Sequence, residues 1–384
     1  MAITRRQKGF ALIIVLSLSV VLISIVAEII FQTEIESRAS IGERNRVNAE
    51  ASAITGAQFT RLLFILDNGI PAEFRPQVEQ ALGGKQIFQM LDDVPIGGEA
   101  LATLPDLGKI NLNAMLDGAL LDGLKAVPGY FVLKTTDENA KLNLNLAIRQ
   151  DMAGWLYQAL KKLFSGQRER TFLEEKGIKP ERLAAQIVDY VDPGDRDHAE
   201  PGTDEALPYE QAKFTHKPKN APLESMEEIR RIPGMNDDEV YDLFSPYLTV
   251  WPKNPTSAAS LNINSAPPEL MAALLANESG EVVEEKFDNY EDNRAKKSAE
   301  DIKDVSETCQ VVTGNTKCPD FISNMAVTKS STFKVEIQGV SNGIERTLVY
   351  VFDRGIKWGT ESAKKTPTAA AESPKFKVLY EHFM

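Results

Sequence analysis

The sequence predicts an α+β protein with one long N-terminal helix, an antiparallel β-sheet and a large helical domain inserted into the sheet-forming part. Three observations lead to this class. An uncharged run at 10–27 passes directly into a helical pattern with an apolar stripe. Alternating strands at 332–340 and 344–352 flank a Ser-Asn-Gly turn, which is a strong hairpin signal. Helical patterns separate this hairpin from an earlier strand at 129–135, which favours an insertion over a string of separate domains.

Length and charge narrow the function classes. The chain has 384 residues and a formal net charge of −12, so it can bury a sizeable core but lacks the basic face that a general phosphate-backbone binder needs. Cys309 and Cys318 are its two cysteines, and their spacing does not match a zinc site. We expect free thiols in a reducing compartment and a disulfide across the short loop in an exported protein.

The N-terminal run is long enough to cross a membrane. Its eighteen residues, 10–27, extend roughly 27 Å as a helix, close to the hydrocarbon thickness of a bilayer. Arg5, Arg6 and Lys8 precede the run and predict a cytoplasmic N-terminus. The pattern then continues without the small-residue cleavage site of a secretory signal. We therefore expect one continuous helix over 10–66, half in lipid and half against a soluble domain; a simple uncleaved signal anchor is the alternative.

Further elements are indicated by shorter patterns. Amphipathic periodicity predicts helices at 73–92, 148–165 and 179–191. Three stretches alternate apolar residues with Asn, and each precedes a helical run. We expect short strands or extended turns whose amide side chains cap the next helix, with ligand binding as the alternative. These stretches are KINLNA at 109–114, KLNLNL at 141–146 and LNINSA at 261–266.

The most acidic stretch is IVDYVDPGDRDHAEPGTDEALPYE, at 187–210. Its prolines and glycines prevent a helix, so the loop turns repeatedly and can point several carboxylates inward. Such a loop is either solvated or a flexible oxygen cage for calcium, although its spacing does not match an EF-hand. His198 is expected to be a solvated surface residue. Neither a nucleophile motif nor a phosphate-binding loop accompanies the acids, so we do not expect an enzyme. The seven carboxylates are Asp189, Asp192, Asp195, Asp197, Glu200, Asp204 and Glu205.

The stretch SMEEIRRIPGMNDDEVYDLFSPYL, at 225–248, has the form of a helix-hairpin-helix unit. Such units can hold DNA phosphates through turn amides, so a membrane-anchored protein for DNA binding or uptake is a rival interpretation. Acids outnumber bases here, and Asp237, Asp238 and Glu239 directly follow the turn, which would repel an anionic backbone. A small helical packing module is the favoured interpretation.

The start of the chain resembles the type IV prepilin class, through its basic leader, Gly9-Phe10 and the long helix. The resemblance implies a leader at 1–9, cleavage by a prepilin peptidase before Phe10, and methylation. Most members carry a glutamate at the fifth mature position, where this chain has Ile14. That glutamate is thought to offset the N-terminal ammonium of a neighbouring subunit in the apolar filament core. Its absence argues for a subunit at the tip.

The order of motifs closely resembles the K-class minor pseudopilins of bacterial type II secretion systems, over most of residues 1–353. It implies a pseudopilin-type antiparallel sheet domain at 67–147 and 325–353 that carries an inserted α-helical domain at 148–324. Residues 354–384 read as a flexible tail. The motifs, besides the prepilin-like start, are IVDYVDPGD, SMEEIRRIPGM, LNINSAPPELMAAL and the final hairpin.

The same resemblance implies the function and its partners. The chain would be a non-enzymatic subunit of the inner membrane, with a periplasmic globular part, at the pseudopilus tip together with the I- and J-class minor pseudopilins. There it would aid pseudopilus assembly and protein export, and contact exported cargo or the outer-membrane channel. A type IV pilus-like minor pilin is the alternative within the same class, and a hydrolase that uses the acidic loop is a further rival.

Calcium binding through acidic residues near the insertion is also implied by the resemblance. Here Gly202-Thr203-Asp204-Glu205 stands where the family form has a glycine-alanine-glutamate-aspartate run. The candidate ligands are Asp189, Asp192, Asp195, Asp197, Asp204 and Glu205.

Overall fold

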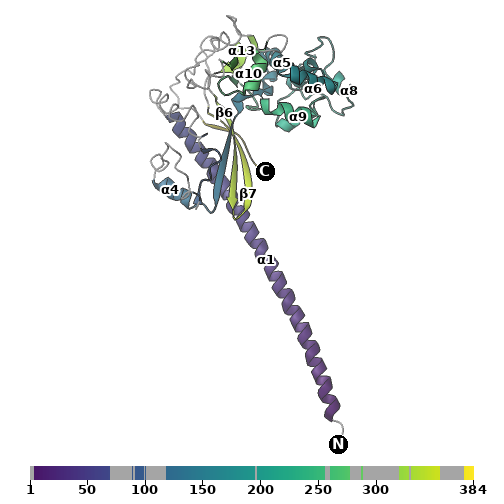
Figure 1. Cartoon of the computed structure of the whole chain (residues 1–384), viewed down its shortest axis with the longest axis vertical. Coiled ribbons are helices and arrows are strands. Elements are labelled where there is room, and N and C mark those ends of the chain that lie inside the picture. Colours follow the sequence, from purple (N-terminus) through teal and green to yellow (C-terminus); the bar gives the residue numbers. More distant parts are fainter. Residues whose placement is uncertain are drawn as a thin grey trace.

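A rod, a sheet and a helical domain make up the computed structural model (Figure 1). The rod is α1 (Thr4–Gly69), a single helix of 66 residues, so the predicted continuous helix is confirmed. The predicted α+β class is also confirmed. The structure describes residues 4–69, 89, 91–98, 100, 118–194, 197–255, 260–276, 287–288, 320–327, 330–354 and 376–384.

The two halves of α1 have different surroundings. From Leu12 to Phe31 the side chains are exposed all round, and α1 is the helix in the described part of the chain that is long and apolar enough to cross a membrane. The second half packs on the sheet with small residues such as Ala49 and Ala53. Gly339 permits the close approach, since a Cβ atom there would lie 2.0 Å from the Ala49 carbonyl oxygen.

The sheet has four antiparallel strands in the order β1-β6-β7-β8. The predicted hairpin is present: Ser341 pairs with Ile344 across a two-residue turn. Asn342 and Gly343 have φ values of 49° and 80°, as a type I′ turn requires. The strands are β1 (Tyr130–Asp137), β6 (Thr332–Ser341), β7 (Ile344–Asp353) and β8 (Lys377–Phe383).

The prediction of a flexible tail at 354–384 was wrong for its last residues. They form β8, an ordered strand that pairs with β7 from Lys377 to Phe383. Alternating Val378, Tyr380 and His382 could have indicated a strand, but the Lys- and Ala-rich stretch before them determined the prediction. Residues 355–375 lie outside the described part.

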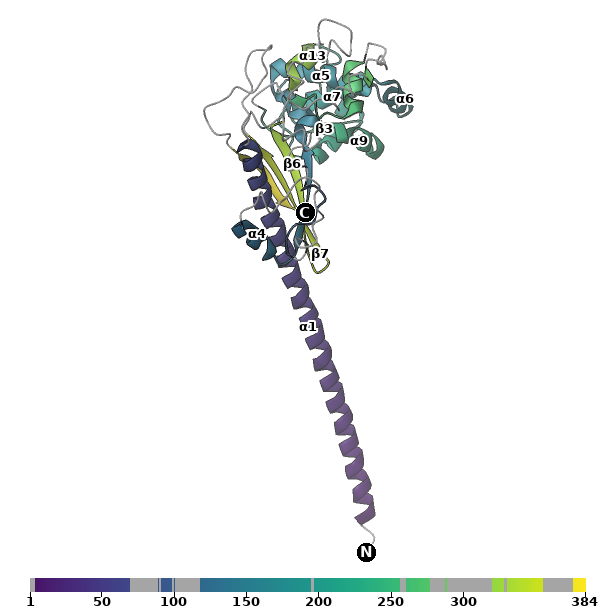
Figure 2. The same ribbon diagram turned by 60° about the vertical axis from the view of Figure 1, so that its left-hand side comes forward.

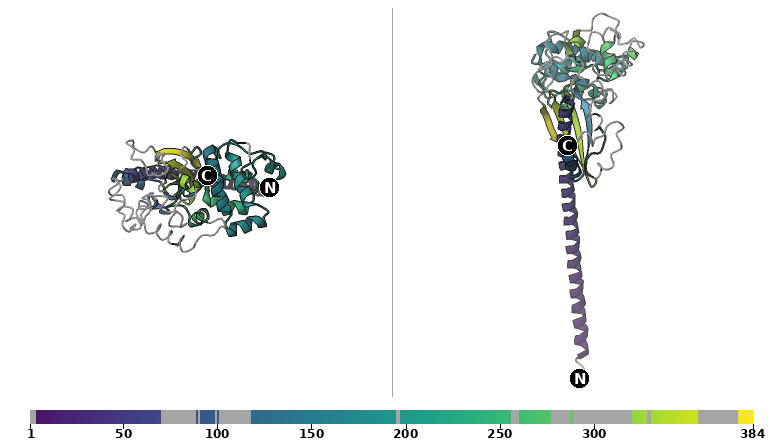
Figure 3. Two further views of the ribbon diagram at one scale, coloured as in Figure 1. Left: turned by 90° about the horizontal axis from the view of Figure 1, so that it is seen from above. Right: turned by 90° about the vertical axis from the view of Figure 1, so that its left-hand side faces the viewer.

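The helical domain is an insertion between β1 and β6. The chain leaves the sheet after Asp137 and returns at Thr332, and Asp137 pairs with Phe333. Its helices lie beyond the end of the sheet that is far from the N-terminus (Figures 1 and 2), and seen from above they lie to one side of the end of α1 that packs on the sheet (Figure 3, left). They are α5 (Gln150–Phe164), α6 (Gln167–Glu175), α7 (Pro180–Val191), α8 (Leu207–Gln211), η5 (Met226–Arg231), α9 (Asp238–Phe244), η6 (Ser245–Tyr247), α10 (Pro268–Leu275) and α13 (Asp320–Met325).

The insertion starts about ten residues earlier than the expected boundary at 148. Short elements there are η3 (Glu138–Ala140), β2 (Leu142–Asn143) and η4 (Leu144–Ile148). Their apolar side chains belong to the core of the helical domain and not to the core of the sheet. The expected boundary had left the Leu-Asn stretch at 141–146 in the sheet domain. A separate helix, α4 (Gly118–Lys125), lies beside α1 (Figure 2).

Two of the three Leu-Asn stretches form short strands as predicted, but the expected capping is found only for Asn143, which caps η4. The helix α10 follows Pro267 and has no side-chain cap. Asn143 follows Leu142 in a two-residue strand, and its carboxamide oxygen accepts a hydrogen bond from the Asn145 backbone N–H at the start of η4. Asn262 ends β4 (Leu261–Asn262) and accepts from Asn264 in the same way. Strands β2 and β4 pair in parallel with β3 (Leu248–Thr249) and β5 (Ala326–Val327). The third stretch, 109–114, and most of the helix expected at 73–92 lie outside the described residues.

The junction of sheet and helical domain is a polar cluster, which we call the joint: Asp137, Glu138 and Asn139 with their partners. The Asp137 carboxylate accepts hydrogen bonds from the Ser265 and Ser330 hydroxyls, both at 2.5 Å. Asn139 accepts from the backbone N–H groups of residues 331 and 332, both at 2.8 Å, and donates to the carbonyl of residue 260. Each polar atom of the Asn139 side chain is thereby used, so the joint links β1, the start of β6 and the chain before β4.

Candidate functional site

The acidic loop is anchored on α7. This helix starts with Pro180 at its first turn and buries an apolar face, so its axis is held in the helical core. Asp189 and Asp192 lie three residues apart at its end and share one side of the helix. Asp192 is the C-cap residue, and its backbone N–H donates to the Val188 carbonyl. Both carboxylates are buried, at 2% and 7% exposure.

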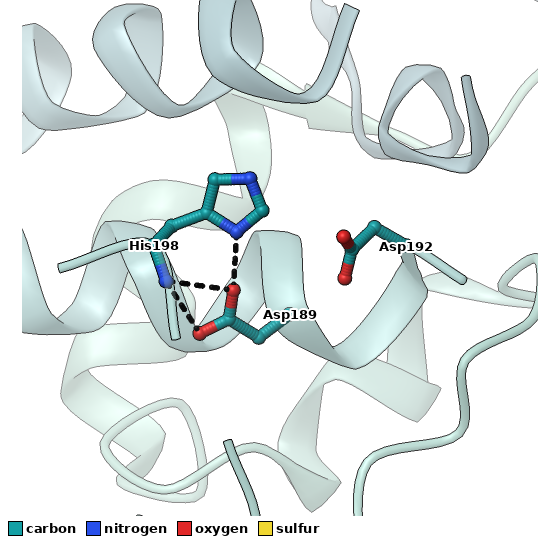
Figure 4. A group of neighbouring side chains, drawn as sticks. All are labelled: Asp189, Asp192 and His198. Carbon is teal, nitrogen blue, oxygen red and sulfur yellow. Dashed lines mark hydrogen bonds and ion pairs between the residues drawn. The ribbon is translucent and has the colours of Figure 1, made fainter. Parts of the chain in front are cut away.

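His198 returns from the loop to face this helix end. Its ring Nδ1 lies 2.5 Å from Asp189 Oδ1, and its backbone N–H donates to the same carboxylate (Figure 4). The Asp192 carboxylate points toward this pair in the figure, and the ligand atoms of the three residues all lie within 4.8 Å of one another. The expectation of a solvated His198 was therefore wrong, because the hydrogen bond to Asp189 holds the ring half-buried.

The Asp189–His198 pair retains protons more strongly than free side chains would. Burial raises the pKa of the Asp189 carboxyl, against the lowering effect of its hydrogen bond to His198. That hydrogen bond raises the pKa of His198, while burial of the ring opposes it. Burial away from water disfavours the charged form of each side chain, whereas the hydrogen bond between them favours a carboxylate paired with an imidazolium.

Asp197 is held by a different set of partners. Arg182, from the first turns of α7, places its Nη1 atom 2.7 Å from Asp197 Oδ2. The other carboxylate oxygen accepts hydrogen bonds from the backbone N–H groups of Ala199 and Glu200 at 2.7 and 2.9 Å. With a fully buried side chain and these partners, Asp197 organises the turn of the loop.

The end of the loop forms a second polar group. Glu205 is buried and its Oε1 atom accepts from the Asn220 Nδ2 group at 2.8 Å, while the same Nδ2 group donates to the Gly194 carbonyl at 2.9 Å. Asn220 Oδ1 is also buried, and it has no hydrogen-bond partner among the described residues. Asn220 adopts φ 51°, which Asn tolerates better than most residues. Asp204 turns its Oδ1 to the Ala206 N–H group at 2.9 Å.

Beside this group the surface is hollowed. A cavity of about 940 Å³ is lined by residues 201–206 of the loop together with Lys217, Pro218 and Asn220. Beneath the loop Tyr209 is 1% exposed, and burial raises the pKa of its phenol, with the charges of Asp189 and Glu205 adding to the effect. Its hydroxyl has no hydrogen-bond partner in the described part of the chain. Buried oxygen atoms therefore lie close to a cavity that opens to the solvent.

The structure separates the six predicted ligands into groups. Asp189 and Asp192 lie together, Asp197 is paired with Arg182, and Glu205 faces Asn220. Asp195 lies outside the described residues, as do Cys309 and Cys318. Sequence reasoning missed His198, Arg182 and Asn220 as partners. Only the preference of Asn for left-handed backbone could have drawn attention to Asn220, which follows Lys-Pro-Lys in an irregular segment.

The helix-hairpin-helix-like stretch carries acids at the position where a phosphate would bind. Gly234, with φ 90°, makes the turn between η5 and α9. Asp237 caps α9 by accepting from the N–H groups of Glu239 and Val240, and Lys176 pairs with both Asp237 and Glu239. The amides at the start of this helix are thus already bonded to a carboxylate, which disfavours an anionic ligand.

A family model and a solved structure are similar to parts of this chain. Residues 140–253 match the family model described as type II secretion system (T2SS), protein K. This segment begins at the joint and contains the whole acidic loop. No curated protein matches the chain. Among solved structures, a chain of the GspK-GspI-GspJ complex from the enterotoxigenic Escherichia coli type 2 secretion system matches with a TM-score of 0.47 and 17% identity, over 67% of this chain and 80% of that chain.

Proposed function

We propose, taking residues 140–253 as a type II secretion protein K domain, that this chain is a minor pseudopilin that caps the tip of a secretion pseudopilus. The supporting observation is the arrangement along α1. An apolar, exposed segment begins the rod, the sheet packs on its far half, and the helical domain lies beyond the sheet (Figure 1). The bulk at that end would obstruct a further subunit above it, while leaving the rod open to subunits below.

In this proposal the chain anchors in the inner membrane by α1, and its globular part lies in the periplasm. A prepilin peptidase removes 1–9, and the I- and J-class minor pseudopilins are its neighbours. The solved complex named above assembles proteins called GspK, GspI and GspJ. Ile14, at the fifth position after cleavage, suits a subunit with no ammonium group above it to neutralise.

Processing gives the most direct test of the proposal. Mass spectrometry of the chain from cells that contain a prepilin peptidase should give Phe10 as the first residue. Gly9→Val should leave Met1 or Ala2 at the start, whereas Gly42→Ala, in open space on the same helix, should be cleaved normally. A wild-type chain that keeps its leader would contradict the assignment.

The tip position has its own test. Co-purification with I- and J-class pseudopilins should give one copy of this chain per complex, and the chain alone should form no filaments. Long filaments made of this chain alone would contradict a capping role and favour an ordinary pilin. Salt-sensitive DNA binding in a gel-shift assay would favour the rival DNA-uptake function.

We also propose that the acidic loop binds calcium. Hard oxygen donors with room around them suit this ion, and the buried Asn220 Oδ1 beside Glu205 is the observation in favour. Asp189 and Asp192 would supply carboxylates from α7, and Glu205, Asn220 and the Gly194 carbonyl would supply oxygens from the loop end. Asp195 and Asp204 are further candidates, while Asp197 already has Arg182 as its partner. The ion would offset the repulsion among carboxylates and stiffen the loop.

Thermal unfolding of the full chain in detergent tests the calcium site. Calcium at one hundred times its Kd should raise the free energy of unfolding by about 2.7 kcal/mol, which raises Tm by several degrees. Asp192→Asn and Asn220→Leu should reduce the shift strongly, and Glu210→Gln, an exposed carboxyl on α8, should retain it. An equal shift in all variants would place calcium elsewhere, and no shift in the wild type would refute the site.

A further inference from the structure

The C-terminal strand β8 occupies the outer edge of the sheet (Figure 3, right). At the opposite edge, β1 is already bridged by Asp92 and Ile96. Strand β7 has ten residues, and without β8 its outer edge would present unpaired backbone groups. Residues 355–375 separate the two strands in sequence, so no short turn holds β8 in place.

One set of β8 contacts belongs to the core between α1 and the sheet. The ring of Phe376, just before β8, stacks on Phe352 with centroids 5.0 Å apart, and the Arg61 guanidinium lies 5.6 Å from the Phe376 ring. Phe383 packs against the same core from the other end of the strand. These contacts attach both ends of β8 to the rod-and-sheet unit.

A second set belongs to the helical domain. The ring centroids of Tyr380 and Trp251 lie 5.3 Å apart. Leu379 and Tyr380 both pack on the helical core. Trp251 follows β3 and is 8% exposed. The middle of β8 therefore contacts the helical domain, while its ends contact the sheet.

The joint and β8 both contact the segment 248–252. In the joint, the Thr249 hydroxyl donates to the buried Glu138 carboxylate. The same Thr249 oxygen accepts from the Trp251 backbone N–H at 3.1 Å. The joint thus holds this segment from the β1 side, and Tyr380 contacts it from the β8 side. Because these two attachments come from opposite edges of the sheet, together they restrain rotation of the helical domain relative to the sheet. A single attachment would permit that rotation.

We propose that β8 is a strap that holds the helical domain in one orientation on the sheet and closes the β7 edge. The strap works through Tyr380 on Trp251, with Phe376 and Phe383 as its anchors. Loss of the Tyr380 ring releases the segment 248–252 and loosens β8 from β7, while the core of the helical domain keeps its own packing. This inference is independent of the secretion function and of calcium.

Hydrogen–deuterium exchange of the full chain in detergent tests the strap. Tyr380→Ala should speed exchange of the amides at 248–251 and in β7 on the order of tenfold, since a packed aromatic pair contributes about that factor. Exchange in α7, which lies in the helical core, should stay unchanged. Tyr380→Phe keeps the ring and should exchange like the wild type.

Val378→Ala is the matched control, because Val378 lies on the same strand and is 41% exposed. It should leave the segment 248–252 at the wild-type rate. Equal exchange there in Tyr380→Ala and Val378→Ala would overturn the strap. Faster exchange throughout α7 in Tyr380→Ala would also overturn it, since Tyr380 would then be a general stabiliser of the helical domain and not a link between domains.

Discussion

The joint and the acidic loop both shield carboxylates from solvent, Asp137 partly and Glu138 almost fully at the joint, but they surround these groups with different partners. At the joint, Asp137 is met by two hydroxyls and a backbone N–H group, and Glu138 by the Thr249 hydroxyl and by Lys141. The acidic loop holds its carboxylates with Arg182, His198 and an amide. A cavity adjoins it, and a buried amide oxygen there has no partner among the described residues.

The carboxylates of the joint fix the contact between chain segments, whereas those of the acidic loop are suited to binding a cation. At the joint, hydroxyl and backbone N–H groups from several chain segments, together with the Lys141 ammonium, donate to the carboxylates, so the arrangement specifies how the segments meet. The loop relies on ionic partners and leaves oxygen atoms beside open space, an arrangement suited to an added cation. Three substitutions test this distinction, from the largest expected effect to the smallest.

Arg182→Met removes the ionic partner of Asp197 and should cost about 4 kcal/mol of unfolding free energy, because a buried carboxylate is left without its cation. Urea unfolding measures the loss. Arg170→Met, on the exposed side of α6, is the control and should cost less than about 0.5 kcal/mol. Similar small losses in both variants would mean that Asp197 does not depend on its ion pair.

Asn139→Ala removes the amide that satisfies two backbone N–H groups and one carbonyl at the joint. We expect a loss of about 2–3 kcal/mol, since these groups become unsatisfied inside the protein. The loss should be equal with calcium and with a chelator, unlike changes in the loop. Asn324→Ala is the control, because its exposed amide donates to the Asp320 carbonyl within the same helix turn, and it should change stability little. A calcium-dependent loss at Asn139 would erase the distinction between the two regions.

Asp137→Asn should change how stability depends on pH. Burial raises the pKa of Asp137 above its usual value, despite the hydrogen bonds that lower it, so the folded state binds this proton more tightly than the unfolded state. The contribution to stability is therefore present below about pH 4 and is lost as the pH rises through the folded pKa. Relative to the wild type, Asp137→Asn should gain stability over that rise.

Asp151→Asn provides a control of opposite sign. The Arg149 hydrogen bond lowers the pKa of the exposed Asp151 carboxyl, so its small contribution is lost as the pH falls. Unfolding curves collected from acid to neutral pH should therefore diverge in opposite directions for the two variants. Parallel curves would show that Asp137 is not titrating differently in the folded state.

Local patterns predicted the elements whose sequences determine them. The apolar run indicated α1, the Asn-Gly turn indicated the β6–β7 hairpin, and periodicity indicated α5 and α7. The β8 strand was missed because its pairing with β7 and its aromatic contacts come from segments remote in sequence. The start of the insertion was misplaced for a similar reason, since only packing decides that Leu142 and Leu144 face the helical core.

The candidate site could be located from the sequence but not resolved into its groups. A dense set of acids predicted where a cation could bind. It did not indicate that Arg182, seven residues before Asp189, would reach the loop, or that Asn220 would return beside Glu205. Helix geometry and the path of the loop set these pairings, and neither can be read from composition.

The pairing of Asp137 with Phe333 has a consequence for how the polypeptide can fold. Strands β1 and β6 are far apart in sequence, and bringing them together as free ends would carry a large loop-closure entropy. Once the inserted helical domain has folded around its own apolar core, it holds the end of β1 next to the start of β6. The pairing of two strands that are remote in sequence then requires little further loop closure. The hydrogen bonds of the sheet can form from Asp137 and Phe333 toward the hairpin.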